Sequence, residues 1–241
     1  MILAEYPRSG GTWVSYLLSY CLNLPMIDLD SSTPKPSDPL TRELVLGKWQ
    51  HRKFSELRRI AKTHKLPQHI NSLPLETKIL LVRDGRDCMT SYYFLKNKKH
   101  KVTSIRDFFK WSKKLLNHED KDFVNFIYKY GLEWKNHVNA HLEDADYVLK
   151  YEDLNQNATL ALKKLFHYFD LDVSEEIITY AVDLFSFENM TKGREKGKED
   201  SKHFFRKAVV GDWKQKFNDK HMLAWNNTGA NEVLRQFGYV E

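Results

Sequence analysis

The sequence predicts an α/β fold, a three-layer sandwich whose mostly parallel central sheet of about four to five strands is flanked by helices. Short runs rich in Ile, Leu and Val alternate along the chain with longer stretches of helical character, the pattern of a doubly wound parallel sheet. Each apolar run also ends in a residue that can contact an anion, a base or a nucleophile. In a parallel sheet these ends share one edge, where open α/β sheets bind ligands. The sequence therefore predicts both the fold class and the functional edge.

The predicted strands are residues 2–6, 59–63, 78–83 and 147–151. The segments predicted to be helical are residues 12–22, 85–95, 105–116, 121–142, 159–169 and 175–184. Ser104 and Ser174 precede two of these helices and are suitable N-caps. Because no internal repeat or second domain is evident, we expect one domain over residues 1–241, with an acceptor-side loop at 30–54 and a charge-rich lid at 192–205.

Composition and charge exclude several classes of protein. Lys and Arg outnumber Asp and Glu, 38 against 32, which favours a polyanionic ligand such as a nucleotide with several phosphates. A hydrophobic fraction of 41% excludes disorder, and no apolar run approaches the ~20 residues that would span a bilayer. No secretion signal is predicted at the start of the sequence. Cys21 and Cys88 lie in separate predicted helices, which is typical of reduced thiols in a cytoplasmic protein.

The first predicted strand leads into a loop of small residues, Tyr6-Pro7-Arg8-Ser9-Gly10-Gly11-Thr12-Trp13. A strand, a small-residue loop and a helix in this order point backbone N–H groups and the positive end of a helix dipole at an anion. Arg8 and the hydroxyls of Ser9 and Thr12 lie beside those amides. A Gly-Gly turn alone is common, so the anion-binding hypothesis depends on the other segments.

Five segments together resemble the sulfotransferases that use 3′-phosphoadenylyl sulfate (PAPS), particularly the cytosolic type, which have a P-loop-like fold. Residues 6–13 look like that family's 5′-phosphosulfate loop, usually Tyr-Pro-Lys-Ser-Gly-Thr-Thr-Trp. The family segment with the catalytic base is similar to Lys62-Thr63-His64. The other three are similar to Arg83-Asp84-Gly85-Arg86-Asp87 with Ser91-Tyr92-Tyr93, to Tyr151-Glu152-Asp153-Leu154, and to Arg206-Lys207-Ala208-Val209-Val210-Gly211-Asp212-Trp213-Lys214. The segments follow the family's order over nearly the whole chain.

The resemblance implies a reaction and assigns residues to it. An acceptor hydroxyl attacks the sulfur of PAPS in line, and adenosine 3′,5′-bisphosphate (PAP) leaves. His64 would be the general base, Lys62 would neutralise the transferring sulfonate, and Arg8 would stabilise the leaving group. This chemistry needs no metal, and no His, Cys or Asp cluster in the sequence has ligand spacing.

The same resemblance implies which residues bind the nucleotide. Those around the 5′-phosphosulfate are Arg8, Ser9, Gly10, Gly11, Thr12 and Trp13. Those around the 3′-phosphate are Arg83, Ser91, Arg206, Lys207 and Ala208. Those on the nucleoside side are Tyr151, Ser186 and, on the two faces of the adenine, Trp13 and Phe187. For Phe187 a structural alternative stays open, a core aromatic beside Phe185.

Several positions depart from the family pattern. Arg8 replaces a lysine, which removes a proton donor but keeps a charged hydrogen-bond donor. Gly11 replaces a threonine, Ala208 a glycine, and Phe185 a residue that is often threonine. The family's short dimer motif is not recognisable after Trp213, so the sequence leaves the oligomeric state open.

A histidine base points to a hydroxyl acceptor on a small molecule or a glycan. Because the chain begins at its first strand, we expect the acceptor site to be built from residues 30–54, 64–71 and 92–103. The aromatic residues at 92–94 and 108–111 would suit a flat apolar acceptor, but their helical spacing also suits a protein core.

Three other functions compete with this one. The first is a non-catalytic module that binds PAP or PAPS and has lost turnover through Arg8 and Gly11. The second, a P-loop small-molecule kinase, needs Gly-x-x-x-x-Gly-Lys-Ser/Thr, which the chain lacks. The third, a nucleic-acid-binding protein, needs a basic stripe with an aromatic platform, whereas the basic residues here are scattered. The sequence therefore favours an active sulfotransferase, with the non-catalytic module as the main alternative.

Overall fold

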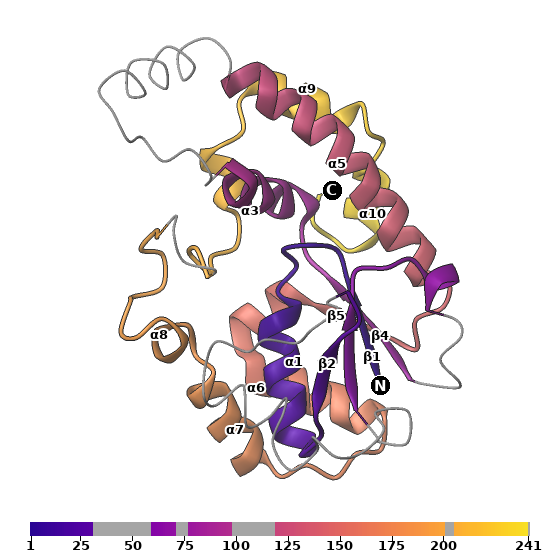
Figure 1. Cartoon of the computed structure of the whole chain (residues 1–241), viewed down its shortest axis with the longest axis vertical. Coiled ribbons are helices and arrows are strands. Elements are labelled where there is room, and N and C mark those ends of the chain that lie inside the picture. Colours follow the sequence, from indigo (N-terminus) through magenta and orange to yellow (C-terminus); the bar gives the residue numbers. More distant parts are fainter. Residues whose placement is uncertain (31–58, 71–76, 98–118, 201–204, 241) are drawn as a thin grey trace. The chain divides into compact units, whose positions relative to one another are not determined.

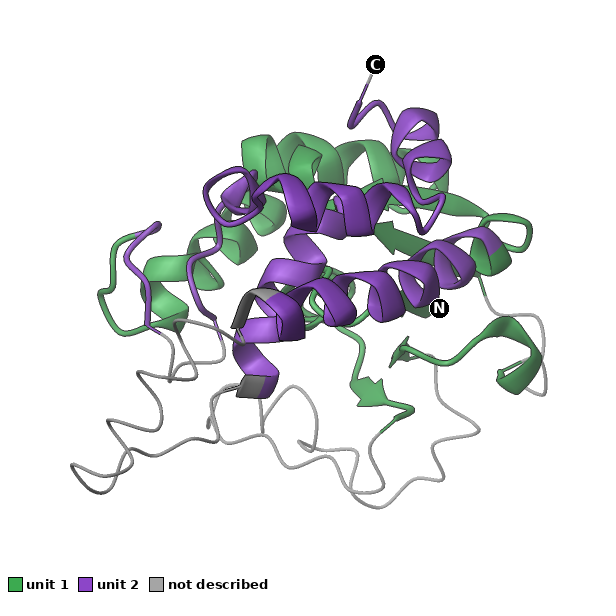
Figure 2. Ribbon diagram, turned by 90° about the horizontal axis from the view of Figure 1, so that it is seen from above, with its two compact units in different colours: residues 1–83, 140–195 green, residues 84–139, 196–241 purple. Residues whose placement is uncertain are grey.

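The computed structural model describes residues 1–30, 59–70, 77–97, 119–200 and 205–240 (Figure 1). The chain divides into two compact units, which are coloured separately in Figure 2. The first unit comprises Met1–Arg83 and Ala140–Glu195, and the second comprises Asp84–Asn139 and Lys196–Glu241. The first contains the sheet, and the described part of the second is built from helices and connecting loops.

The first unit is built on a five-stranded sheet with strand order β2-β3-β1-β4-β5, and all its neighbouring strands are parallel. The strands are β1 (Ile2–Glu5), β2 (Met26–Asp28), β3 (Ile60–Thr63), β4 (Lys78–Val82) and β5 (Tyr147–Lys150). The predicted α/β class, with a mostly parallel sheet flanked by helices, is confirmed. Strand β2 was not predicted, because its three residues are too few to show a periodic pattern.

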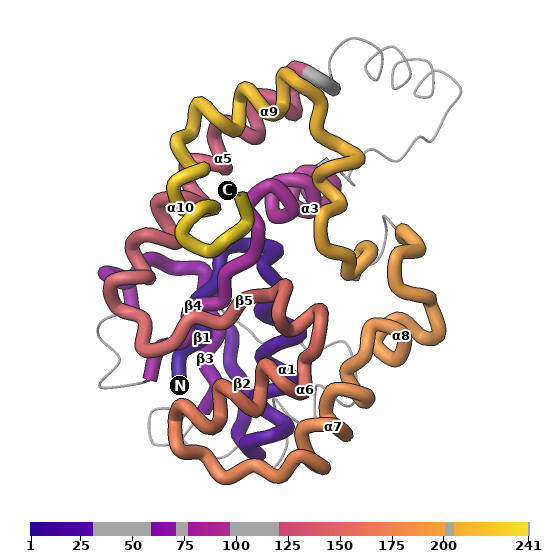
Figure 3. The backbone as a smooth tube through the Cα atoms, turned by 180° about the vertical axis from the view of Figure 1, so that it is seen from behind, coloured from indigo at the N-terminus to yellow at the C-terminus, as the bar shows by residue number. Residues whose placement is uncertain are grey.

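Three helices pack on one face of this sheet (Figures 1 and 3): α1 (Gly11–Leu22), α6 (Tyr151–Tyr168) and α7 (Glu175–Leu184). Leu3 and Ile79 point from the sheet into the core that these helices form, whereas Ile2 and Ala61 point to the opposite face. Successive side chains of a strand alternate between faces, so a strand buried on both faces is a continuous apolar run. This is why β1 and β4 could be predicted from composition.

Two helix starts show what the sequence could and could not predict. The Oγ of Ser174 accepts a hydrogen bond from the Ile177 N–H at 3.3 Å, so this predicted N-cap is confirmed. Helix α6 begins at Tyr151, before the predicted start at residue 159, and Asn157 interrupts it with φ −153° and ψ 90°. The Asn157 side chain accepts from the Leu160 N–H at 3.0 Å, as an N-cap does. The predicted helix is therefore the part of α6 that follows this interruption.

The second unit is described by five helical segments: α3 (Gly85–Asn97), most of α5 (Glu119–Leu142), the 3₁₀ turn η3 (Asp212–Gln215), α9 (Asp219–Asn226) and α10 (Asn231–Gln236). Trp134 and Trp225 are fully buried here, with ring centroids 5.6 Å apart. A Cβ on Gly85 would lie 2.4 Å from the Trp225 ring and 2.7 Å from the Trp134 ring, so only glycine fits. The predicted helix at 105–116 and its cap Ser104 lie outside the described residues.

Neither Cys21 nor Cys88 forms a disulfide, and both thiols are buried. Burial raises the pKa of Cys21 to about 11, so this thiol stays protonated and unreactive at neutral pH. Across the described ranges, no helix is both long enough and apolar enough to cross a membrane.

Candidate active site

The loop between β1 and α1 is the first element of the site. Arg8 and Gly10 have positive φ angles of 78° and 105°, a conformation that residues with side chains rarely adopt. A Cβ on Gly10 would also lie 2.7 Å from the Tyr151 ring, so residue 10 must be glycine for two reasons. Gly10 is the N-cap of α1 and offers no side chain to the first turn, where helix N–H groups point outward. The loop thus has the construction that the sequence predicted for anion binding.

Glu5, the last residue of β1, lies against this loop. Only 3% of Glu5 is exposed, and its Oε2 accepts a hydrogen bond from the Gly11 N–H at 2.5 Å. Its Oε1 is 3.7 Å from Lys62 Nζ and 3.9 Å from His64 Nδ1. The carboxylate therefore faces the loop and two predicted catalytic side chains, Lys62 in β3 and His64 just after it.

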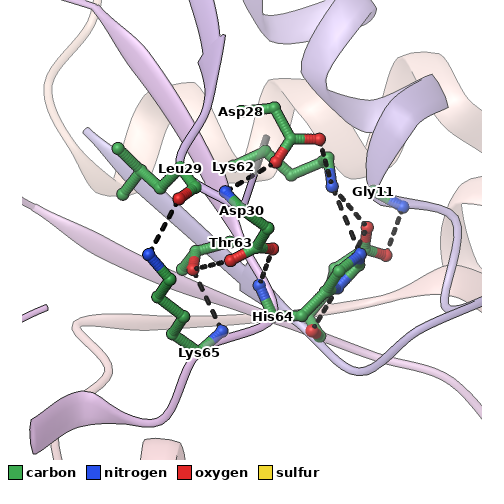
Figure 4. Close-up of polar contacts among 9 residues, drawn as sticks. Gly11, Asp28, Leu29, Asp30, Lys62, Thr63, His64 and Lys65 are labelled. Carbon is green, nitrogen blue, oxygen red and sulfur yellow. Dashed lines mark hydrogen bonds and ion pairs between the residues drawn. The ribbon is translucent and has the colours of Figure 1, made fainter. Parts of the chain in front are cut away.

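Lys62 and His64 are adjacent in space at the end of β3, as Figure 4 shows. His64 Nδ1 is 3.0 Å from the carbonyl oxygen of Glu5. Because a carbonyl oxygen can only accept, Nδ1 carries the hydrogen, and the Nε2 of the neutral ring has the lone pair. Lys62 Nζ lies 3.3 Å from this Nε2 and 3.1 Å from Asp28 Oδ2. Nε2 is therefore the ring nitrogen without a hydrogen, and its lone pair faces the Lys62 ammonium.

Asp30 fixes the backbone of the Lys62-Thr63-His64 segment (Figure 4). Its carboxylate accepts from the His64 N–H at 2.6 Å and from the Thr63 hydroxyl at 3.1 Å. Lys65 adds a second tie, since its N–H donates to Thr63 Oγ1 at 3.0 Å and its ammonium donates to the Leu29 carbonyl at 2.9 Å. The end of β3 is thus held to the end of β2 by hydrogen bonds.

Arg83, which follows β4, meets the same loop from the other side. Its guanidinium donates to the Arg8 carbonyl oxygen at 3.2 Å and lies over the Tyr151 ring, 4.3 Å from the centroid. Tyr151 also contacts the Trp13 ring edge to face, with centroids 6.1 Å apart. The first unit therefore brings the predicted residues Arg8, His64 and Arg83 to one loop.

In the second unit, two predicted motifs bind each other. The buried Asp87 carboxylate accepts from the Gly211 N–H at 2.7 Å and from the Trp213 N–H at 3.0 Å. Arg86 pairs with Asp84 at 2.7 Å and stacks on the Trp213 ring, 3.8 Å from its centroid. These residues tie the start of α3 to η3, a structural function.

Arg206 and Lys207 share two carboxylates in the second unit. Glu199 lies 3.1 Å from Arg206 and 3.2 Å from Lys207, and Asp212 pairs with both, at 2.9 Å from Lys207. Burial by itself raises the pKa of Asp212, but hydrogen bonds from the two cations and their charges outweigh it and lower the pKa. The next residue, Ala208, has a positive φ of 54°, a conformation in which glycine is less strained.

Comparison with known proteins decides the family. Residues 1–230 match the family model described as Sulfotransferase domain. The chain belongs to the sulfotransferase family. Sulfotransferase 1B1 of Mus musculus is 30% identical over 253 residues, which cover 90% of this chain and 77% of that protein. Sulfotransferase 6B1 of Danio rerio is 25% identical over 228 residues, covering 91% of this chain and 73% of that protein.

The fold comparison agrees. The crystal structure of mouse sulfotransferase SULT7A1, complexed with PAP, matches with a TM-score of 0.64 at 17% identity, over 99% of this chain and 88% of that one. A structure of retinol dehydratase, in complex with androsterone and PAP, matches with a TM-score of 0.61 at 20% identity, over 96% of this chain and 80% of that one. The predicted class of enzyme, a sulfotransferase of the cytosolic type, is confirmed by the family match.

The predicted nucleotide residues of this sulfotransferase are divided between its units. Those in the first unit are Arg8, Ser9, Gly10, Gly11, Thr12, Trp13, Arg83, Tyr151, Ser186 and Phe187. Those in the second are Ser91, Arg206, Lys207 and Ala208.

On the predicted nucleoside side, the structure separates two aromatic residues. Phe185 is 1% exposed and belongs to the core, whereas Phe187 is partly exposed and lies under the Arg194 guanidinium, 4.9 Å from its ring centroid. Phe187 is therefore not one of the buried core residues, unlike its neighbour Phe185. Ser186 is the N-cap of the short helix α8 (Phe187–Met190), and its Oγ accepts from the Asn189 N–H at 3.3 Å.

The aromatic residues of α3 pack within the second unit. Tyr92 contacts the Tyr130 ring at 5.3 Å, and Tyr93 contacts the Phe123 ring at 4.4 Å. These contacts favour the core interpretation for both tyrosines. The remaining parts of the predicted acceptor site, residues 31–54, 71 and 98–103, lie outside the described residues, as do 108–111 and residues 201–204 of the predicted lid.

The sequence analysis missed three acidic residues of the site: Glu5, Asp28 and Asp30. Glu5 ends β1, which the sequence predicted, just before the small-residue loop, a signal that could have identified it, whereas Asp28 and Asp30 end or follow β2, which the sequence did not predict. Among the residues with described positions, no group of three or more His, Cys, Asp or Glu side chains could hold a metal ion.

Proposed function

We propose that this sulfotransferase moves the sulfuryl group of PAPS to a hydroxyl of a small-molecule or glycan acceptor, with His64 as the general base. The observation that carries the proposal is the hydrogen bond from His64 Nδ1–H to the Glu5 carbonyl. It leaves Nε2 as a proton acceptor beside Lys62 and next to a loop built for an anion.

The residues present fit a 5′-phosphosulfate at this loop. The N-terminal turn of α1 provides the positive end of a helix, and Gly10 adds no side chain there; the Gly11 N–H is taken by Glu5, so the later N–H groups of the turn are the ones offered to the anion. Arg8 and Arg83 add two cations at the same loop. PAPS supplies the sulfuryl group, and PAP is the partner named in the structures of mouse SULT7A1 and retinol dehydratase.

The protein's own groups handle one proton and one developing charge. As the acceptor oxygen forms its bond to sulfur and the bridging S–O bond breaks, His64 Nε2 takes the hydroxyl proton. The Lys62 ammonium offsets the charge of the sulfonate. Arg8 hydrogen-bonds the leaving oxygen without giving up a proton, because a guanidinium stays charged.

The proposal extends to the 3′-phosphate and the adenine as the resemblance implies. Arg83, Ser91, Arg206, Lys207 and the Ala208 amide would bind the phosphate. Trp13, Tyr151, Ser186 and Phe187 would form the nucleoside side. Residues 30–54 would line the acceptor and 192–205 would close as a lid. A cytoplasmic location is proposed from relatives such as Cytosolic sulfotransferase 7 of Arabidopsis thaliana, 26% identical over 256 residues.

The test measures binding and transfer separately. The purified protein should bind PAP without Mg²⁺, at least tenfold more tightly than AMP, by isothermal titration calorimetry. His64→Ala should abolish transfer from ³⁵S-labelled PAPS to a panel of phenols, alcohols and sugars while its Kd for PAP stays within about threefold. His69→Ala is the matched control, since His69 is exposed in the neighbouring turn η2 (Pro67–His69).

Four results would point elsewhere. Equal affinity for AMP and PAP, or a strict Mg²⁺ requirement, would contradict the PAPS assignment. PAP binding with no sulfated product from any acceptor would favour the non-catalytic module. Loss of PAP binding and of folding in His64→Ala would reassign His64 to structure.

A further inference from the structure

The Glu5 carboxylate lies in the space that a side chain at position 11 would need. A Cβ built on Gly11 would lie 2.1 Å from the Glu5 carboxyl carbon, 2.1 Å from Oε1 and 2.5 Å from Oε2. Carbon atoms that are not bonded do not approach so closely, so a side chain at residue 11 requires the buried Glu5 carboxylate to move from its hydrogen bond with the Gly11 N–H. The Glu5 carboxylate therefore lies where the side chain of residue 11 would begin.

The backbone does not itself require glycine at position 11. Gly11 is the first residue of α1 and is not among the glycines with positive φ, unlike Gly10. Alanine has the better helix propensity at an ordinary helical position. The glycine is thus explained by its neighbour, which gives a physical reason for this departure from the family's loop.

The buried carboxylate compensates its own burial through specific partners. It accepts the Gly11 N–H at 2.5 Å, at the positive end of α1, and it lies 3.7 Å from the Lys62 ammonium. Lys62 has a 6% exposed side chain and a second anionic partner, Asp28 at 3.1 Å. The ammonium is therefore held between carboxylates of β1 and β2, with His64 Nε2 at 3.3 Å.

We propose that Glu5 and Gly11 form a coupled pair, in which the bare Gly11 admits the Glu5 carboxylate and the carboxylate positions the Lys62 ammonium beside His64. The second part of this proposal, that Glu5 positions Lys62 for catalysis, rests on the function proposed above. Glu5 touches no reacting atom in this scheme, so it is a positioning residue.

A double-mutant cycle tests the pair without any need for activity. Gly11→Ala should lower the Tm by about 5 °C, because overpacking is destabilising and a protein of this size shifts by about 2–4 °C per kcal/mol. In the Glu5→Ala background the same change should shift the Tm by less than about 1 °C. Asp28→Asn is the matched control: it removes the other carboxylate on Lys62 but leaves Gly11 untouched, so its combination with Gly11→Ala should be additive.

Two results would overturn the pair. One is a Gly11→Ala protein as stable as the wild type. The other is an equal loss of Tm with and without Glu5, which would mean that something else excludes the side chain. The Kd for PAP should follow the same pattern, weakened by Gly11→Ala and recovered in the double variant.

Glu5→Gln tests the second part of the proposal, because the amide oxygen can still accept from Gly11 N–H while the charge is lost. Release of ³⁵S-sulfate from labelled PAPS to water, which needs no identified acceptor, should fall about tenfold in kcat with KM for PAPS within threefold. An unchanged kcat, or a loss that only follows a lower Tm, would refute the positioning. If the wild type releases no sulfate, transfer to a hydroxyl acceptor is unaffected as a proposal, and the contact is tested by stability alone. A double-mutant cycle of Glu5→Gln and Lys62→Met, measured by Tm, then tests the contact between the two side chains. Additive changes in Tm would refute that contact.

Discussion

Glu199→Gln should strengthen the binding of PAP about fivefold. Glu199 lies 3.1 Å from Arg206 and 3.2 Å from Lys207, the two cations proposed for the 3′-phosphate, so a bound phosphate must compete with it. A unit-charge pair about 4 Å apart is worth roughly 1 kcal/mol when fully screened by water and more when buried. The Glu199 side chain is 31% exposed, so about 1 kcal/mol of lost competition is the appropriate scale, which corresponds to about fivefold in Kd.

The assay is titration calorimetry of PAP and AMP at one ionic strength, without Mg²⁺. AMP lacks the 3′-phosphate, so its affinity should stay within about twofold in the variant. Glu195→Gln is the matched control, since it removes an exposed charge four positions earlier in the sequence. An unchanged Kd for PAP would refute the reasoning. An equal gain in affinity for AMP, or an equal gain in affinity for PAP in Glu195→Gln, would show that the effect of Glu199→Gln comes only from the change in net charge.

Three further predictions concern stability. Asp87→Asn should lower the free energy of unfolding by about 3 kcal/mol in urea, because the buried carboxylate accepts two backbone N–H groups, and a loss below about 1 kcal/mol would contradict this. Gly85→Ala should lower it by at least about 2 kcal/mol, because its Cβ would meet the Trp225 ring at 2.4 Å; an unchanged urea midpoint would show that the rings can move apart. Asp212→Asn should flatten the loss of Tm in acid. Since Arg206 and Lys207 lower the Asp212 pKa, its stabilisation is complete above the ordinary carboxyl pKa of about 4 and disappears as the pH falls through the lower folded-state value. The explanation would be wrong if the difference in Tm between this variant and the wild type stayed constant from pH 6 to pH 3.

The strands were predictable because of where they lie. β1 and β4 are buried on both faces of a parallel sheet, so their apolar content alone marks them, and the predicted functional residues Arg8 and Arg83 follow them. Strand β2 has only three residues, and it contributes through Asp28 and through Asp30 just after it. An acidic residue at the start of a loop is ordinary in sequence, so neither carboxylate could be assigned without the fold.

Long-range hydrogen bonds are the second class of feature that the sequence could not predict. Asp87 belongs to the family-like segment that begins at Arg83, and its carboxylate accepts from Gly211 and Trp213, more than 120 residues away in the chain. The two motifs were identified correctly as signatures of the family. The hydrogen bonds between the two motifs, within the second unit, could be identified only from the structure.

The dependence of the site on β1 explains how its loop can depart from the family's usual sequence. His64 is oriented by the carbonyl oxygen of Glu5, and Arg83 donates to the carbonyl oxygen of Arg8. Both acceptors belong to the backbone, so neither hydrogen bond depends on which side chain position 8 carries. Under the proposed mechanism, arginine in place of lysine at position 8 should keep both backbone hydrogen bonds and alter only the group offered to the leaving oxygen. Position 11 is different, because the Glu5 carboxylate fills the space of its side chain. Substitutions at Arg8 should accordingly keep these two backbone hydrogen bonds while changing the group offered to the leaving oxygen, whereas substitutions at Gly11 should be coupled to Glu5.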